Sequence, residues 1–184
     1  MLLCIDIGNT NIVLGVYRGE ELVTHWRVAT AHNRMPDEYA ILLLQLFSYS
    51  GHDPTTLRGV AISSVVPPLT GTFTELSETY LGLTPLVVDA GVRTGVRIRY
   101  DNPREVGADR VVNAAAAYRL YGGPACIVDF GTATTFDAIN AEGDYLGGAI
   151  APGIRISAEA LFTRTAKLPR IDPVSYTHLT LPTN

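Results

Sequence analysis

The segment LLCIDIGNTNIVLGVYRGEELVTHWRVA, residues 2–29, decides the fold of this chain. It starts with an apolar run, turns at the polar residues 9–11, and continues in two further runs at 12–17 and 21–29. Short apolar runs separated by turn residues are typical of strands joined by tight turns. The segment therefore predicts a meander of three strands, with Asp6 near the end of the first.

A second segment, ACIVDFGTATTFDAI at residues 125–139, starts the same pattern again. Its first apolar run also ends in an acid and a glycine, Asp129 and Gly131, and another strand-like run follows at 145–150. We interpret the repeat as a duplicated structural unit, because the order of predicted strands repeats together with the motif. The alternative is that two independent strand-turn sites share an Asp-x-Gly sequence by chance.

Helices and short strands are predicted between and after the two meanders, which gives an α/β fold. The pattern divides the chain into a first domain at 1–108, a second and shorter domain at 109–173, and a tail at 174–184. Asp37 is the expected N-cap of the first helix. The further predicted elements are helices at 37–49, 69–81, 109–121 and 153–162, and strands at 59–63 and 86–88.

The tail differs from the rest of the chain. Residues 174–184 are rich in Thr and Pro and have no amphipathic period. The stretch at 175–184 resembles translated sequencing-adapter sequence, so we expect it to be non-native and assign no function to it. The alternative is a short natural tail.

Composition excludes several classes of protein. Of the 184 residues 47% are hydrophobic, and the formal net charge is −4. No basic stripe that would neutralise a nucleic-acid backbone is visible, and no apolar run reaches the roughly 20 residues that span a bilayer. The N-terminus does not read as a signal peptide, so a cytoplasmic location is expected. Cys4 and Cys126 lie in apolar runs and are predicted to be buried, reduced thiols.

Two acid-glycine-hydroxyl turns that face each other across a cleft suit a nucleoside triphosphate. Glycine lets the backbone approach the ligand, and backbone N–H groups with the hydroxyls of Thr10, Thr132 and Thr134 can donate to phosphate oxygens. The acids would repel phosphate, so they must act through a cation. Asp6 is thus a candidate Mg²⁺ ligand, directly or through water, and Asp129 a candidate cation ligand. The alternative for Asp6 is a turn-capping residue.

A third candidate site precedes the Ala-rich helix, at Asp109 and Arg110. Asp109 could serve as general base for a substrate hydroxyl, or it could only stabilise the N-terminus of the helix. Arg110 could hold a substrate carboxylate or phosphate, or form a surface ion pair with Glu105 or Asp101. The residues alone leave both alternatives open.

Four motifs stand in a fixed order along the chain. They are Asp6-Ile7-Gly8-Asn9-Thr10-Asn11, Gly107-Ala108-Asp109-Arg110, Asp129-Phe130-Gly131-Thr132-Ala133-Thr134-Thr135 and the glycine-rich stretch 147–153. In this order they resemble type III pantothenate kinases over residues 1 to about 173. The resemblance implies an actin-like (ribonuclease H-like) duplicated fold with mixed sheets, flanking helices and an incomplete second domain.

The resemblance also implies a function: ATP-dependent phosphorylation of pantothenate to 4′-phosphopantothenate, the first step of coenzyme A biosynthesis. Asp109 would be the catalytic base, and Asp129 would hold K⁺ or NH₄⁺. Asp6 would bind Mg²⁺, directly or through water. Pantothenate and a second copy of the chain, in a homodimer, would be the partners. The implied ATP-binding residues are Asp6, Ile7, Gly8, Asn9, Thr10, Asn11, Ile12, Val13 and Thr132, and the implied substrate-binding residues are Tyr100, Gly107, Ala108, Asp109 and Arg110.

The chain departs from the family's pattern at its C-terminus, where about the last third of a usual member is missing. We therefore expect turnover from a version with a complete C-terminus and little from this chain. Two alternatives stay open: a non-catalytic regulator of the same family that assists transcription, and another actin-like phosphotransferase that acts on a different small molecule.

Overall fold

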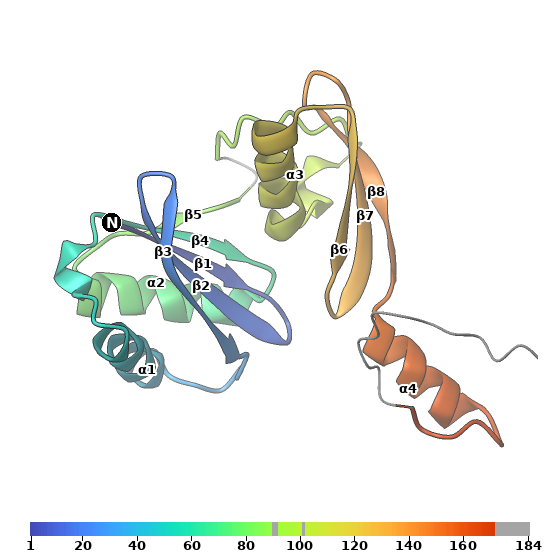
Figure 1. The fold of residues 1–184 in the computed structure, drawn as a ribbon, viewed down its shortest axis with the longest axis horizontal. Helices are drawn as coiled ribbons and strands as arrows, with labels where there is room; N and C mark the ends of the chain where they lie inside the picture. Colours follow the sequence, from blue (N-terminus) through green and yellow to red (C-terminus); the bar gives the residue numbers. More distant parts are fainter. Residues whose placement is uncertain (90–91, 101, 172–184) are drawn as a thin grey trace, which may run out of the picture.

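The structure, a computed structural model, describes residues 1–89, 92–100 and 102–171. The predicted non-native tail at 174–184 lies outside the described residues. Two sheets make up the fold, and Figure 1 shows them side by side, with the helix α3 (Ala108–Tyr121) beside both.

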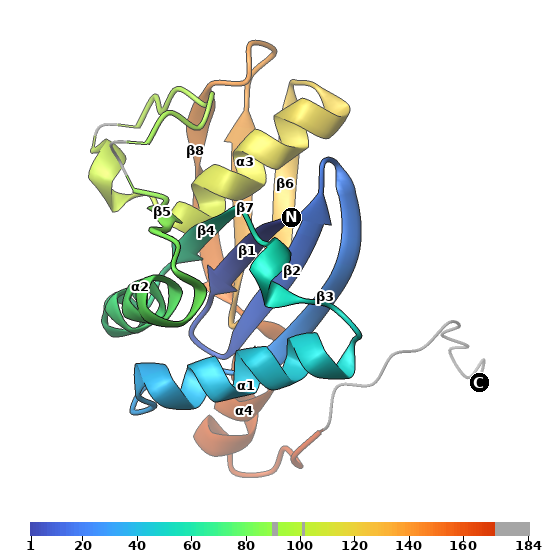
Figure 2. The ribbon, with the colours of Figure 1, turned by 90° about the vertical axis from the view of Figure 1, so that its left-hand side faces the viewer.

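The first sheet carries the first meander. Its strands lie in the order β3-β2-β1-β4-β5, with β1 antiparallel to β2 and parallel to β4. Alternate residues of β1 and β2 are buried and form the main core together with two helices, α1 (Pro36–Tyr49) and α2 (Pro67–Leu81). Figure 2 shows both helices on the same face of the sheet. The strands are β1 (Leu2–Ile7), β2 (Asn11–Arg18), β3 (Glu21–Ala29), β4 (Gly59–Ser64) and β5 (Leu86–Val87).

The prediction that Asp37 caps the first helix was wrong. The helix begins at Pro36, and Met35 is the N-cap residue. Proline is favoured in the first turn because its φ is already helical and its missing N–H would have no partner there. The Glu38 side chain accepts a hydrogen bond from the Met35 backbone N–H at 2.9 Å, which closes this end of the helix.

The second sheet repeats the meander with three antiparallel strands. They are β6 (Ala125–Phe130), β7 (Ala133–Ile139) and β8 (Tyr145–Pro152), in that order. The inner face packs against α3 through a small core that contains Ala114, Ile139 and Tyr145. The helix α4 (Ile154–Arg164) follows β8 and has no buried residue. Two 3₁₀ turns, η1 (Pro54–Thr56) and η2 (Pro103–Glu105), complete the described elements.

The sequence prediction that both cysteines are buried holds only in part. Cys4 is half-buried, whereas Cys126 is exposed. Residues 126, 128 and 130 of β6 share the outer face of the second sheet, and all three are exposed. An apolar run cannot show which of the two faces of a strand is covered, because side chains alternate between the faces.

The two meanders place their acids alike. Asp6 and Asp129 are each the fifth residue of a six-residue strand that pairs with the next strand in antiparallel fashion. The turns that follow are closed by similar backbone hydrogen bonds, from Gly8 N to Asn11 O at 3.0 Å and from Gly131 N to Ala133 O at 2.9 Å. The repeated sequence pattern therefore corresponds to a repeated structure.

In the part of the chain that the structure describes, every helix is too short or too polar to traverse a lipid bilayer.

Candidate active site

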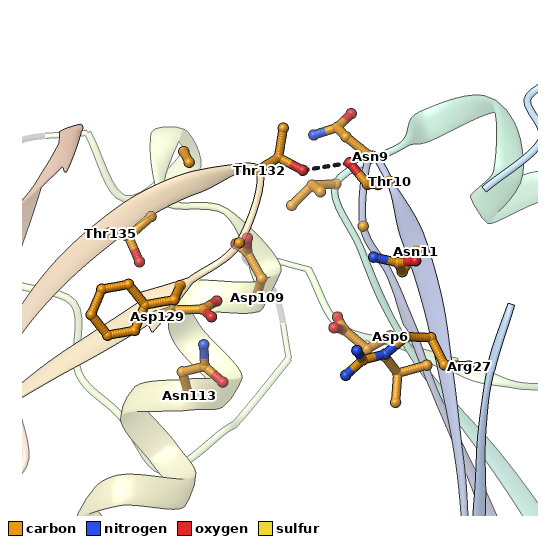
Figure 3. A pocket seen from close by; sticks show the side chains of 16 residues that line it. Asp6, Asn9, Thr10, Asn11, Arg27, Asp109, Asn113, Asp129, Thr132 and Thr135 are labelled. Carbon is orange, nitrogen blue, oxygen red and sulfur yellow. Dashed lines mark hydrogen bonds between the residues drawn. The ribbon is translucent and has the colours of Figure 1, made fainter. Parts of the chain in front are cut away.

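A cavity of about 400 Å³ lies between the two meanders. Its walls come from β1, β2 and β3 and the turn after β1, from the first two turns of α3, from β6 and β7 with the turn between them, and from Val65. Figure 3 shows Asp6 on one side of this cavity and Asp109 and Asp129 on the other. The three carboxylates therefore share one cavity, although they lie far apart in the sequence.

The two glycine turns meet at the rim of the cavity. The hydroxyl oxygens of Thr10 and Thr132 are 2.7 Å apart and share a hydrogen bond across the cleft. A Cβ added at Gly8 would lie 3.1 Å from the carbonyl oxygen of Asn11, so this turn has little room for a side chain. The Thr30 hydroxyl donates to the Gly8 carbonyl at 2.7 Å and holds the turn from behind. Backbone N–H groups and hydroxyls thus gather where phosphate oxygens could be bound.

Asp6 lies within β1, before the turn, so the alternative of a turn-capping residue does not describe it. Desolvation by the surrounding protein raises the pKa of Asp6, and the negative charges of Asp109 and Asp129 raise it further. The side chain is still exposed in the open cleft, so this desolvation is partial. The nearby Ser63 hydroxyl opposes the rise, although it forms no hydrogen bond of ordinary geometry with the described residues.

Asp109 is the second residue of α3, which follows the N-cap residue Gly107. Its Oδ1 atom accepts a hydrogen bond from the Arg110 backbone N–H at 2.8 Å. Burial raises the pKa of Asp109, and the charges of Asp129 and Asp137 add to the rise, while Arg110 opposes it. Asp109 therefore stabilises the start of a helix and also faces the cavity, so the two interpretations of this residue are compatible.

Asp129 is exposed in the cleft and pairs with Thr135 of β7, which lines the same cavity. Asp6 faces it from the first sheet. Among the described residues no three His, Cys, Asp or Glu side chains gather into a metal site. The donor set fits a cation that takes one carboxylate from the protein and further oxygens from phosphate and water, as Mg²⁺ commonly does.

Arg110 points away from this cavity, between α3 and the second sheet. Its Nε donates to Asp137 Oδ1 at 2.6 Å, and the Tyr145 hydroxyl donates to the same oxygen at 2.7 Å. Asp137 is fully buried, and only 14% of the Arg110 side chain is exposed. Burial and the neighbouring Asp137 carboxylate raise the pKa of Tyr145. Arg110 thus forms its ion pair with Asp137 and not with Glu105. Asp101, the other predicted surface partner, lies outside the described residues.

The other predicted substrate residues lie in two places. Gly107 and Ala108 line a second cavity of about 550 Å³, whose walls also include Val65, Pro103 and Val111. Tyr100 lies instead over β8, where a Cβ added at Gly147 would come within 3.4 Å of its ring. Val65 lines both cavities, so the two are neighbours.

Sequence reasoning missed several residues at this site. Arg27, Asn113 and Thr135 line the first cavity, and Asp137 holds Arg110. The sequence carried one usable signal, because Asp137 lies two residues before Ile139 in a strand and therefore shares its buried face. Arg27 and Asn113 gave no local signal, since an exposed charge on a strand or an Asn in a helix is usually solvated.

Comparisons with known proteins agree with this geometry. A profile of the family described as type III pantothenate kinase matches residues 2–184. A type III pantothenate kinase from Moorella thermoacetica is 60% identical over 174 residues, which are 95% of this chain and 68% of that protein. Two solved structures share the fold. One, from Campylobacter jejuni, is assigned to the Baf family of transcriptional activators (TM-score 0.54, 20% identity, 97% of this chain and 68% of that one). The other is the activator of 2-hydroxyisocaproyl-CoA dehydratase from Clostridium difficile, with bound ADPNP (TM-score 0.52, 12% identity, 90% of this chain and 53% of that one).

The repeated meanders and the acid-glycine turns on both sides of a cleft define an actin-like fold. Within that class, the chain belongs to the type III pantothenate kinase family.

The raised pKa values predict how stability depends on pH. Relative to a double variant with Asp6→Asn and Asp109→Asn, the wild-type chain should lose stability as the pH rises above the ordinary carboxyl pKa of 3.8. Both pKa values are raised on folding, so in that window the folded state binds more protons than the unfolded state, and the unfolding free energy falls with pH. Urea unfolding of both proteins between about pH 3 and pH 7 measures this difference.

Asp53→Asn provides a control of opposite sign. The backbone N–H of Thr55, 2.9 Å from Asp53 Oδ1, lowers the pKa of Asp53 on folding. The wild type should therefore gain stability relative to Asp53→Asn as the pH rises through the depressed pKa toward 3.8. The electrostatic description of the cleft would be contradicted in either of two cases. The difference in unfolding free energy between the wild type and the double variant could stay constant with pH, or it could favour the wild type more as the pH rises.

Proposed function

We propose that this protein transfers the γ-phosphoryl group of ATP to the hydroxyl of pantothenate and forms 4′-phosphopantothenate, the first step of coenzyme A biosynthesis. One observation carries the proposal: Asp6, Asp109 and Asp129 line a single cavity whose rim is formed by the two glycine turns. Family membership supplies the substrate, because relatives that are 55–61% identical are type III pantothenate kinases.

Phosphoryl transfer needs positioning and charge stabilisation more than covalent chemistry from the protein. The backbone N–H groups of residues 9–11 and 132, with the hydroxyls of Thr10 and Thr132, would hold the phosphates, while the N–H groups of Gly8 and Gly131 close the turns. The substrate oxygen forms a bond to the γ-phosphorus, the bond to the β-phosphate bridging oxygen breaks, and ADP leaves. Asp109 accepts the hydroxyl proton, and its raised pKa brings it closer to the value that favours proton transfer.

We propose different cations for the acids on the two sides of the cleft. Asp6 would hold Mg²⁺, directly or through water, and Asp129 would hold K⁺ or NH₄⁺. Such cations supply the positive charge that offsets the triphosphate beside three carboxylates. Without a cation between them, the three carboxylates would repel the negatively charged phosphate oxygens.

The second cavity is the proposed site of pantothenate. It is lined by Gly107 and Ala108, next to the proposed base Asp109, and its remaining walls combine apolar side chains with the polar residues Ser64, Asp89 and Thr94.

We also propose, from the family resemblance, that the protein acts as a cytoplasmic homodimer. Apolar side chains exposed on the outer face of the second sheet, Val128, Phe130 and Phe136, support association of two copies of the chain. Sedimentation at several protein concentrations would test this, and a monomer throughout would refute it.

The decisive experiment is an assay of ADP release with pantothenate, run in K⁺ and in Na⁺. It compares this chain with an extended protein, in which residues 1–173 continue into the C-terminal remainder of the Moorella relative. We expect pantothenate-dependent turnover of the extended protein that is faster in K⁺. ATP binding without turnover on pantothenate would favour the regulator, and turnover on another alcohol from a panel would favour a different phosphotransferase.

A further inference from the structure

Arg27 lies in the candidate active site although nothing in its local sequence marks it. It lines the first cavity together with Asp6, Asp109 and Asp129, and Figure 3 shows it on the same side as Asp6 and Asn11. It also lines an adjoining cavity of about 640 Å³ that shares the residues of both glycine turns. Arg27 therefore lies where the two cavities meet.

The register of the first sheet fixes this placement. Asp6 of β1 is opposite Val13 of β2, and Val13 is opposite Arg27 of β3. Residues that are directly opposite on neighbouring strands project from the same face of a sheet. Arg27 and Asp6 therefore share the cleft face, two strands and about 10 Å apart at their Cα atoms, given the usual strand spacing.

The charges of the cavity explain why an arginine is useful there. Among its described lining residues, three are carboxylates and Arg27 is the one cation. No ion pair or side-chain hydrogen bond to another described residue engages the Arg27 guanidinium, which is exposed. An arginine without a partner among the described residues, beside the hydroxyls of Thr10 and Thr132, has its donors available for an anion. The guanidinium fork matches the geometry of phosphate oxygens.

We propose that Arg27 binds the phosphate chain of the nucleotide, as a fixed positive charge that a loosely bound cation could not replace. This inference rests on the proposed function only in that the ligand is a nucleoside triphosphate; it does not depend on which alcohol is phosphorylated. The position of Arg27 on a paired strand, and not on a loop, fixes where its guanidinium can reach.

The test compares Arg27→Gln with Arg18→Gln in the 184-residue chain. Arg18 is an exposed arginine at the far end of β2, outside the described cavities, so the same substitution there is a matched control. Displacement of a fluorescent ATP analogue measures the affinity for Mg-ATP, for inorganic tripolyphosphate and for adenosine. Arg27→Gln should weaken ATP and tripolyphosphate by about 10- to 100-fold, as for the loss of a charged hydrogen bond, and leave adenosine unchanged.

Further measurements separate binding from folding. Arg27→Lys should recover part of the lost affinity, because it keeps the charge but not the fork. The thermal unfolding midpoint of ligand-free Arg27→Gln should stay close to that of the wild type, because the side chain is exposed. Equal ATP affinities of wild type and Arg27→Gln, or an equal loss for adenosine, would overturn the proposal.

The outcomes also separate this inference from the proposed function. If the wild type binds ATP through Arg27 but the extended protein does not phosphorylate pantothenate, the proposed function fails and the inference stands. If pantothenate is phosphorylated and Arg27→Gln binds ATP as well as the wild type does, only the inference fails. A 184-residue wild-type chain that binds no ATP overturns the inference, whereas the turnover of the extended protein decides the proposed function.

Discussion

Replacement of Asp109 by Asn in the extended protein should lower kcat for pantothenate phosphorylation by about 10²–10⁴-fold, the usual contribution of a general base. Asn has nearly the same shape and can still accept the Arg110 backbone N–H, so the start of α3 should be preserved. The affinity for ATP should change little, because the variant removes a proton acceptor and leaves the two glycine turns intact. Steady-state kinetics and ATP titration measure both effects.

Asp53→Asn is the matched control for this variant. Asp53 caps the short turn η1 and lies outside the described cavities, and Asn caps a helix about as well as Asp does. Its kcat should equal that of the wild type. If Asp109→Asn keeps its kcat within a few-fold of the wild type, Asp109 is not the base. If ATP affinity falls as much as kcat, Asp109 acts in binding and not in proton transfer.

Replacement of Asp137 by Ala should destabilise the protein by about 3–5 kcal/mol, because it leaves a buried guanidinium without a counter-ion. Arg110 and Tyr145 both donate to the lost carboxylate, and Asp137 itself is fully buried. Urea unfolding followed by far-UV circular dichroism measures the loss. The single tryptophan, Trp26 of β3, packs against Phe47 of α1, so its fluorescence reports on the first sheet and its helices separately. The urea midpoint of the variant should fall more when it is followed by circular dichroism than when it is followed by Trp26 fluorescence.

Glu20→Ala is the control for an ion pair at the surface. Glu20 lies 3.8 Å from Arg119, and both side chains are largely exposed. Exposed pairs contribute about 0–1 kcal/mol, so this variant should unfold like the wild type. A loss below about 1 kcal/mol for Asp137→Ala would show that Arg110 finds water or another acceptor when Asp137 is removed, and that the network does not hold α3 against the second sheet.

The Arg110–Asp137 pair also bears on the candidate base. Arg110 follows Asp109 directly, so the ion pair that fixes Arg110 on the second sheet also fixes the first turn of α3 beside the cleft. The sequence left two partners open for Arg110, a substrate anion or a carboxylate at the protein surface. The structure gives it a buried partner, and a contact of Arg110 with pantothenate stays a prediction.

The sequence by itself determined the strands, the turns and the positions of the two repeated acids. The third strand was predicted with the same bounds that the structure shows, 21–29, and most other elements agree within one or two residues. These features are local: alternation of apolar residues, turn chemistry at 9–11 and glycines after the acids act over a few residues. The predicted N-cap of the first helix, Asp37, lies two residues after the observed one, Met35, because the helix already begins at Pro36.

Only the tertiary structure decided which side chains meet. Cys126 is exposed because one face of β6 is left uncovered, Arg27 reaches the cleft because of its register with Val13, and Asp137 reaches Arg110 because α3 packs on the second sheet. Each of these facts depends on how strands and helices pair and pack with one another. A shift of one residue in the pairing register would turn every side chain of a strand to the opposite face, and that register depends on the turn together with the apolar pattern of both paired strands.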